Sequence, residues 1–141
     1  MKKLLTIGAL FIIAAEAHAQ CNQTITWTGS KTEYLDSGGA VQDVKTDPIE
    51  IRTTADHITV TVTETNEGPE IIEGDMKNIV CTWADPFKNG KTSFSSVLTK
   101  SNGETKNADI TIEAKNGKIM ILVAVANTNG MKMRIPVDSY Q

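Results

Sequence analysis

The sequence contains little of the chemistry that most catalytic and metal sites need. It has two histidines and two cysteines, and 5% of its residues are aromatic. Beyond the N-terminal segment, His57 is the only histidine, and no G-x-S-x-G motif accompanies it. A zinc site of the usual His/Cys type is excluded if the two cysteines are bridged. We therefore expect no catalytic residue, no metal site and no cofactor. A hydrolase that uses His57 or the acidic loop at 64–75 is the third hypothesis.

Clusters of positive charge and long apolar runs are also missing. The 14 basic and 17 acidic residues give a formal net charge of −3 and are mixed along the chain. Nucleic acid and anionic membrane surfaces are therefore not expected partners, because both need a concentrated basic face. The apolar run at 4–15 is shorter than the roughly 20 residues of a membrane-spanning helix, and no later segment supplies one.

That apolar run is typical of a secretory signal peptide. It follows the basic start Met1-Lys2-Lys3 and precedes Ala17-His18-Ala19, a small-x-small cleavage site. Cleavage after Ala19 is predicted, with cleavage after Ala17 as the weaker alternative. Residues 1–19 are then the signal peptide and residues 20–141 a single domain, exported to the periplasm or the extracellular space.

Both cysteines, Cys21 and Cys81, lie in the predicted mature domain. In an oxidising compartment an even number of cysteines usually means a disulfide, and two cysteines allow one pairing. We expect a Cys21–Cys81 bridge with a structural role, because the close C-x-x-C spacing of a redox site is absent.

Alternation of apolar and polar residues with period two runs through the mature chain and predicts β-strands. The run Ile58-Thr59-Val60-Thr61-Val62-Thr63 is the clearest example, and no segment shows a helical period. We predict an all-β, single-domain antiparallel meander of about 8–10 strands. Short connections favour an up-and-down barrel. Pro136 cannot donate to a ladder, so a two-sheet sandwich is the alternative.

Turn signals predict three hairpins. Asn116-Gly117 and Asn89-Gly90 are both expected to form two-residue turns, which place Ile112 opposite Ile121 and Cys81 opposite Leu98. The last two predicted strands place their apolar residues on the same face of the sheet only if the loop between them has an odd number of residues. We expect a three-residue loop at 128–130, with Gly130 in the left-handed conformation.

An exported meander with an early tryptophan resembles the lipocalin-like small barrels. The sequence departs from their G-x-W signature, because Thr26-Trp27-Thr28-Gly29 places the glycine after the tryptophan. The resemblance implies a small apolar ligand held inside a barrel.

Two groups of residues are candidate binding sites. Trp27, Trp83 and Phe94 are expected either to belong to the core or to line an apolar ligand cavity at a barrel mouth. Met120 and Leu122 belong to the run 119–126, which is apolar on both faces. This run predicts a central strand, or alternatively a surface patch that binds a protein partner.

Acidic residues concentrate between Glu64 and Asp75 without a neighbouring basic residue. The spacing fits no D-x-D-x-D-G loop, so a solvated loop is expected and cation binding is the alternative. Taken together, the sequence favours a secreted, non-catalytic binding module for an apolar ligand or a protein. An envelope protein that assembles through its edge strands is the second hypothesis.

Overall fold

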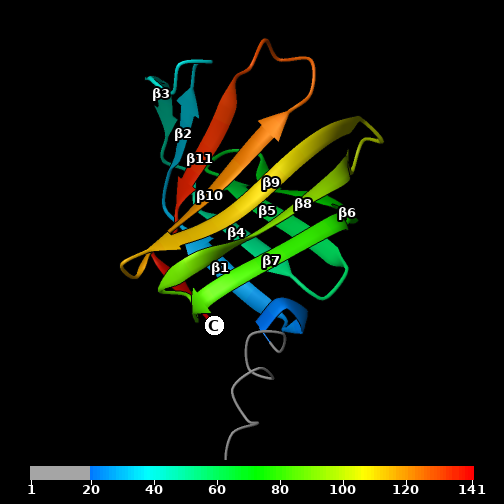
Figure 1. Cartoon of the computed structure of the whole chain (residues 1–141). Helices are drawn as coiled ribbons and strands as arrows, with labels where there is room; N and C mark the ends of the chain where they lie inside the picture. Colours follow the sequence, from blue (N-terminus) through cyan, green and yellow to red (C-terminus); the bar gives the residue numbers. More distant parts are fainter. Residues whose placement is uncertain (1–19) are drawn as a thin grey trace, which may run out of the picture.

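The computed structural model describes residues 20–141, so the expected signal peptide lies outside the described residues. This part of the chain contains one short 3-10 helix and twelve β-strands (Figure 1). The elements are η1 (Gln20–Asn22), β1 (Ile25–Gly29), β2 (Thr32–Leu35), β3 (Val41–Lys45), β4 (Ile49–Thr53), β5 (His57–Glu64), β6 (Gly68–Asp75), β7 (Lys77–Asp85), β8 (Asn89–Lys100), β9 (Thr105–Lys115), β10 (Lys118–Val125), β11 (Lys132–Pro136) and β12 (Ser139–Tyr140). The all-β prediction is confirmed, and the strand count exceeds the 8–10 expected. No helix in residues 20–141 is long and apolar enough to cross a membrane.

All strands belong to one antiparallel sheet. Its order is β12-β1-β4-β5-β6-β8-β9-β10-β11-β2-β3, with β7 paired to β8. The sheet is strongly curled, so that β4 and β5 lie behind β8 to β10 (Figure 1). The alternative, a two-sheet sandwich, is not formed, because one sheet provides both walls. The expected barrel is not formed either, because the ladder does not close.

The ladder is interrupted where the two ends of the chain meet. β1 pairs with β12 and β2 pairs with β11 in one shared register, in which Trp27 faces Tyr140 and Tyr34 faces Met133. Between these pairings, residues 30–31 and residues 137–138 lie outside the strands. Pro136 lacks an N–H to donate, and a Cβ at Gly29 would lie 2.9 Å from the Pro136 carbonyl oxygen. The backbones at residues 29 and 136 therefore approach so closely that position 29 requires a glycine. The hydrogen-bonded ladder has a gap at this point.

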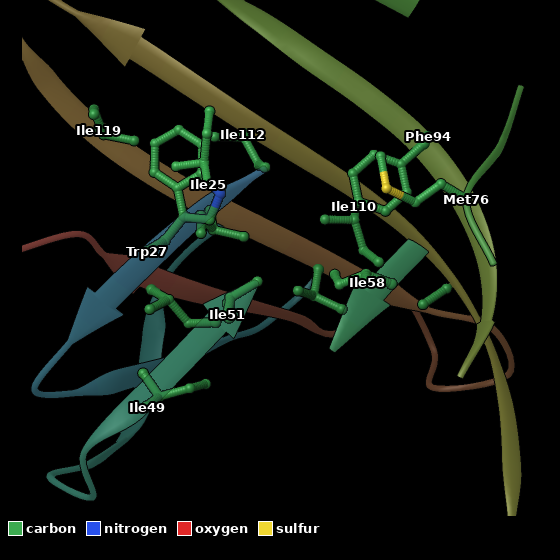
Figure 2. Packing of buried hydrophobic residues seen from close by; sticks show 14 of the residues in the cluster. Ile25, Trp27, Ile49, Ile51, Ile58, Met76, Phe94, Ile110, Ile112 and Ile119 are labelled. Carbon is green, nitrogen blue, oxygen red and sulfur yellow. The ribbon is translucent and has the colours of Figure 1, made fainter. Parts of the chain in front are cut away.

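The concave face of the curled sheet encloses the hydrophobic core. Inward residues alternate with outward ones, as in β4, where Ile49, Ile51 and Thr53 are buried while Glu50 and Arg52 are exposed. Isoleucines from opposite walls meet in the middle (Figure 2). The largest fully buried side chains are Ile51, Ile58, Ile110 and Ile121. Period-two alternation therefore identified the buried face of the main strands.

The hairpin predictions have mixed outcomes. The Asn116-Gly117 turn is confirmed, with Ile112 opposite Ile121. The Asn89-Gly90 turn is wrong: β7 and β8 are joined at 86–88, and Cys81 faces Thr92. Gly90 lies within a strand, where a Cβ would be 2.5 Å from the Thr82 carbonyl oxygen. This glycine therefore allows close strand approach rather than a turn.

The final connection is longer than expected. Gly130 is left-handed, with a φ of 79°. However, Val123 faces Met133 and the loop spans 126–131, so the predicted three-residue loop is wrong. The apolar faces remain in phase, as parity requires. Thr128 stabilises the longer loop by donating its hydroxyl to the Val125 carbonyl at 2.7 Å.

The Cys21–Cys81 disulfide is confirmed. It links η1 to β7 across a Cα–Cα distance of 6.1 Å and a sequence separation of 60 residues. Both cysteines pack against the core cluster. The bridge therefore fastens the start of the described chain to the wall formed by β7 and β8.

Candidate functional site

Trp27, Trp83 and Phe94 are all buried, with at most 8% of each residue exposed. Each indole N–H donates to a threonine hydroxyl: Trp27 to Thr53 at 3.1 Å and Trp83 to Thr92 at 2.8 Å. Buried polar atoms with partners of this kind are typical of a structural role. The three residues occupy the core, which was one of the two interpretations of the sequence.

The two tryptophans belong to an aromatic plug, formed by Trp27, Trp83, Phe87 and Tyr140, at one end of the curled sheet. The ring of Phe87 lies 5.4 Å from Trp27, 5.3 Å from Trp83 and 5.1 Å from Tyr140, between ring centroids. The first two contacts are edge-to-face, a favourable arrangement. The space left beside Trp27 and Trp83 is only about 20 Å³. This end is therefore filled with side chains.

The other end of the curled sheet contains an apolar cavity of about 340 Å³. Its walls come from β4, β5, β6 and β8 to β11, so residues distant in sequence face a common space. The apolar lining is aliphatic: Ile49, Ile51, Ile58, Val60, Val62, Ile72, Leu98, Ile110, Ile121, Val123, Met133 and Ile135. None of Trp27, Trp83 and Phe94 lines it.

Several lining residues are accessible although they point inward. Val60, Val62, Ile72, Leu98 and Met133 are only half-buried. On β5 and β6 the neighbouring outward positions carry threonine, glutamate or an exposed isoleucine. Aliphatic side chains on an inner face remain accessible when they border an open cavity. This apolar cavity is the candidate functional site.

The mouth of the apolar cavity is polar and charged. It is formed by Thr32, Tyr34, Lys45, Asp47, Glu64, Glu70 and Lys100. The ammonium of Lys100 lies 3.1 Å from a carboxylate oxygen of Glu70. This hydrogen bond raises the pKa of Lys100, and the charges of Glu104 and Glu64 add to the effect. Also at the mouth, the Lys45 ammonium lies 5.7 Å from the centre of the Tyr34 ring.

The acidic segment from Glu64 to Asp75 comprises the last residue of β5, a short turn and all of β6. It is therefore part of a β-hairpin rather than the expected solvated loop. β5 and β6 pair along their whole length, so the glutamates alternate across the two faces of β6. Glu70 reaches the mouth of the cavity while Glu73 points outward. Within residues 20–141 no cluster of three or more histidine, cysteine or acidic residues could hold a metal ion.

His57 begins β5 and contacts acids of β6 instead of its neighbour Asp56. Its Nδ1 lies 3.1 Å from an Asp75 oxygen, and its Nε2 lies 3.8 Å from a Glu73 oxygen. The second nitrogen of a catalytic histidine would face a serine hydroxyl. Here both nitrogens face carboxylates, so the geometry provides no activated nucleophile.

Met120 and Leu122 lie on the outer face of β10 and are half-buried. Their cross-strand neighbours include Glu113 on β9 and Arg134 on β11. β10 has a neighbour on each side, as expected for a central strand. The two side chains thus form a narrow apolar strip between charged residues.

Glu33 on β2 links this strand to Arg134 on β11, beside the mouth of the cavity. Its carboxylate accepts a hydrogen bond from Arg134 Nε at 2.6 Å and contacts Lys31 Nζ at 3.1 Å. Arg134 first, and Lys31 second, hold the pKa of Glu33 below its ordinary value of 4.5. A lowered pKa in the folded state stabilises the fold above pH 4.5, and this contribution is lost as the pH falls through the lowered pKa.

We therefore expect Glu33→Gln to lower the free energy of unfolding at pH 7 by about 1 kcal/mol. Below pH 4.5 the difference from the wild type should shrink, since the wild-type carboxylate becomes protonated there. Urea unfolding at pH 7 and pH 3 measures both effects. Glu104→Gln removes an exposed pair with Lys106 and should change little. An equal loss at both pH values would contradict the assignment.

Comparison of the chain with family models, with curated proteins and with solved structures finds no match. The sequence predicted a ligand site at Trp27, Trp83 and Phe94, but both tryptophans belong to the aromatic plug at the opposite end and Phe94 is buried in the core. The available signal was the aliphatic stripe Ile58, Val60 and Val62, alternate residues of β5 that all line the cavity.

Proposed function

We propose that this chain is an exported, non-catalytic binding protein that holds a small apolar ligand in the aliphatic cavity. The observation that carries the proposal is the set of inward-pointing aliphatic side chains that remain accessible through a polar mouth. A volume of about 340 Å³ is at the small end of the range of roughly 300–1,000 Å³ for ligand pockets. One end filled and one end open is also how small β-barrels hold ligands in their mouths.

The energetics favour an apolar occupant. Removing apolar surface from water contributes about 25 cal/mol per Å², and the cavity walls offer such surface on every side. The walls are hydrogen-bonded strands, so few groups must be ordered on binding. Preformed apolar sites therefore bind without a large entropic cost.

Export follows from the sequence of residues 1–19, which has the three regions of a secretory signal. The Cys21–Cys81 disulfide suits an oxidising compartment such as the periplasm or the extracellular space. A protein in such a compartment that binds an apolar molecule would carry it through water or withhold it from other surfaces.

Calorimetric titration of the purified protein with decanol tests the proposal. We expect saturable binding of one decanol per chain. Native mass spectrometry of protein purified from its own host should also show a population with added mass that organic extraction removes. If decanol gave no saturable heat and the native protein carried no extra mass, the proposed function would be wrong.

Assembly through an edge strand is a second candidate function, and one observation favours it. β3 ends the sheet order, all five of its residues are exposed, and Val41 and Val44 are 46% and 44% exposed. An exposed edge of this kind can pair with another strand. Sedimentation velocity should then show concentration-dependent oligomers that Val44→Lys abolishes. A monomer at all concentrations would exclude self-assembly through this edge.

A further inference from the structure

We propose that the cavity selects the single aliphatic chain of a cationic amphiphile, with the ammonium head group at the mouth. The inference rests on the proposed function and names the ligand class for the same site. Three features carry it: the aliphatic walls, the balance of charge at the mouth, and a polar depression that adjoins the mouth.

The walls favour an alkyl chain over an aromatic ring system. Every apolar lining residue below the mouth is aliphatic, and Tyr34 at the mouth is the only aromatic lining residue. Aromatic pairs gain about 0.5–1.5 kcal/mol beyond their buried area. An aromatic ligand in this cavity would find no aromatic partner below the mouth and would not gain this energy. Four aromatic side chains, Trp27, Trp83, Phe87 and Tyr140, form the plug at the other end. A flexible chain can follow the branched side chains that line the space.

The charges at the mouth disfavour an anionic head group. Three carboxylates, Asp47, Glu64 and Glu70, face two ammonium groups, Lys45 and Lys100. Lys100 is already paired with Glu70 at 3.1 Å, and it also lies within the fields of Glu64 and Glu104. A fatty-acid carboxylate would therefore compete with Glu70 for this lysine and would face the remaining acids.

A polar depression of about 480 Å³ adjoins the mouth and would hold the head group. It is lined by residues 44–47, which run from the end of β3 toward β4, and by residues 64–67, the last residue of β5 and the turn to β6. It shares Lys45, Asp47 and Glu64 with the apolar cavity and adds Glu67. Three carboxylates thus face one lysine in the depression. An ammonium head group at this point would compensate the excess negative charge.

Three probes with the same chain and different heads test the inference: decylamine, decanol and decanoate, titrated at pH 7 and low salt. We expect decylamine to bind about tenfold more tightly than decanoate, with decanol between them. High salt should reduce the difference, because it screens charges at an open mouth. Decanoate binding as tightly as decylamine, or more tightly, would overturn the inference while decanol binding would leave the proposed function standing.

A pair of matched variants separates local charge from net charge. Asp47→Asn with Glu64→Gln removes two carboxylates from the mouth and should reduce the preference for decylamine to about threefold or less. Asp85→Asn with Glu113→Gln removes the same charge near the aromatic end. Asp85 faces Asn89 two residues after Trp83, and Glu113 faces Lys91, which follows Gly90, the cross-strand partner of Trp83. This control should keep the tenfold preference. If both double variants lost the preference for decylamine equally, the head-group assignment would be refuted. If none of the three probes bound to the wild type, the proposed function itself would be refuted.

Discussion

Ile72→Trp is expected to abolish most of the decanol binding, with at least a tenfold loss of affinity, or about 1.4 kcal/mol. Ile72 lies on β6 with its side chain half-buried in the wall of the cavity. An indole at this position would fill space that the proposed ligand needs. Because that space is open, we expect little of the 1–3 kcal/mol that overpacking usually costs. Calorimetry measures the affinity, and urea unfolding measures the stability.

The neighbouring residue offers a matched control. Ile71 is next in the same strand, points to the outer face and is 46% exposed. Ile71→Trp therefore makes the same chemical change outside the cavity and should leave decanol affinity unchanged. If both variants bound decanol like the wild type, the ligand would not occupy this cavity. If both lost binding equally, the loss would reflect damage to β6 rather than occupation of the site.

Removal of the disulfide should have the largest effect on stability. The double variant Cys21→Ser, Cys81→Ser is expected to lose about 4 kcal/mol of unfolding free energy, because the bridge closes a loop of 60 residues and restricts the unfolded chain. Urea unfolding measures this loss. Reduction of the wild type by dithiothreitol should reproduce it, which separates loss of the bridge from loss of thiol packing.

The same variants also report on the cavity. The disulfide lies beside the aromatic end, where Cys21 and Trp83 border the same small space. The cavity opens at the other end of the sheet. Decanol affinity measured where the double variant is folded should therefore remain within about twofold of the wild type. A loss of unfolding free energy below about 1 kcal/mol would show that the bridge does not constrain the unfolded chain as proposed.

The strands that alternate cleanly could be predicted, and those that do not were missed. β5 and β10 carry apolar residues at every second position or in an unbroken run, and both were found. β6 was taken for a loop because Gly68, Pro69 and several acids suggest solvent. It is a strand because β5 pairs with it over eight residues, from His57–Asp75 to Glu64–Gly68. Backbone pairing of this kind is set by the partner and leaves little trace in composition.

Registers were predictable only where the turn itself defines them. Asn116-Gly117 favours the left-handed backbone that a two-residue hairpin needs, so its register was correct. Asn89-Gly90 carries the same letters but lies inside the strand, where Gly90 makes room for the backbone of Thr82. The same dipeptide therefore has two roles, and the difference lies in the neighbouring strand.

The sequence by itself determined the strand class, the inward parity of the main strands and the only possible disulfide. These features depend on side-chain periodicity and on counting, both of which are local. The tertiary structure alone decided that one sheet forms both walls, that the ladder is interrupted beside Pro136, and that aromatic residues fill one end while aliphatic residues leave the other open. A cavity is space between residues far apart in the chain, so its position depends on how the sheet curls and on which side chains meet across it.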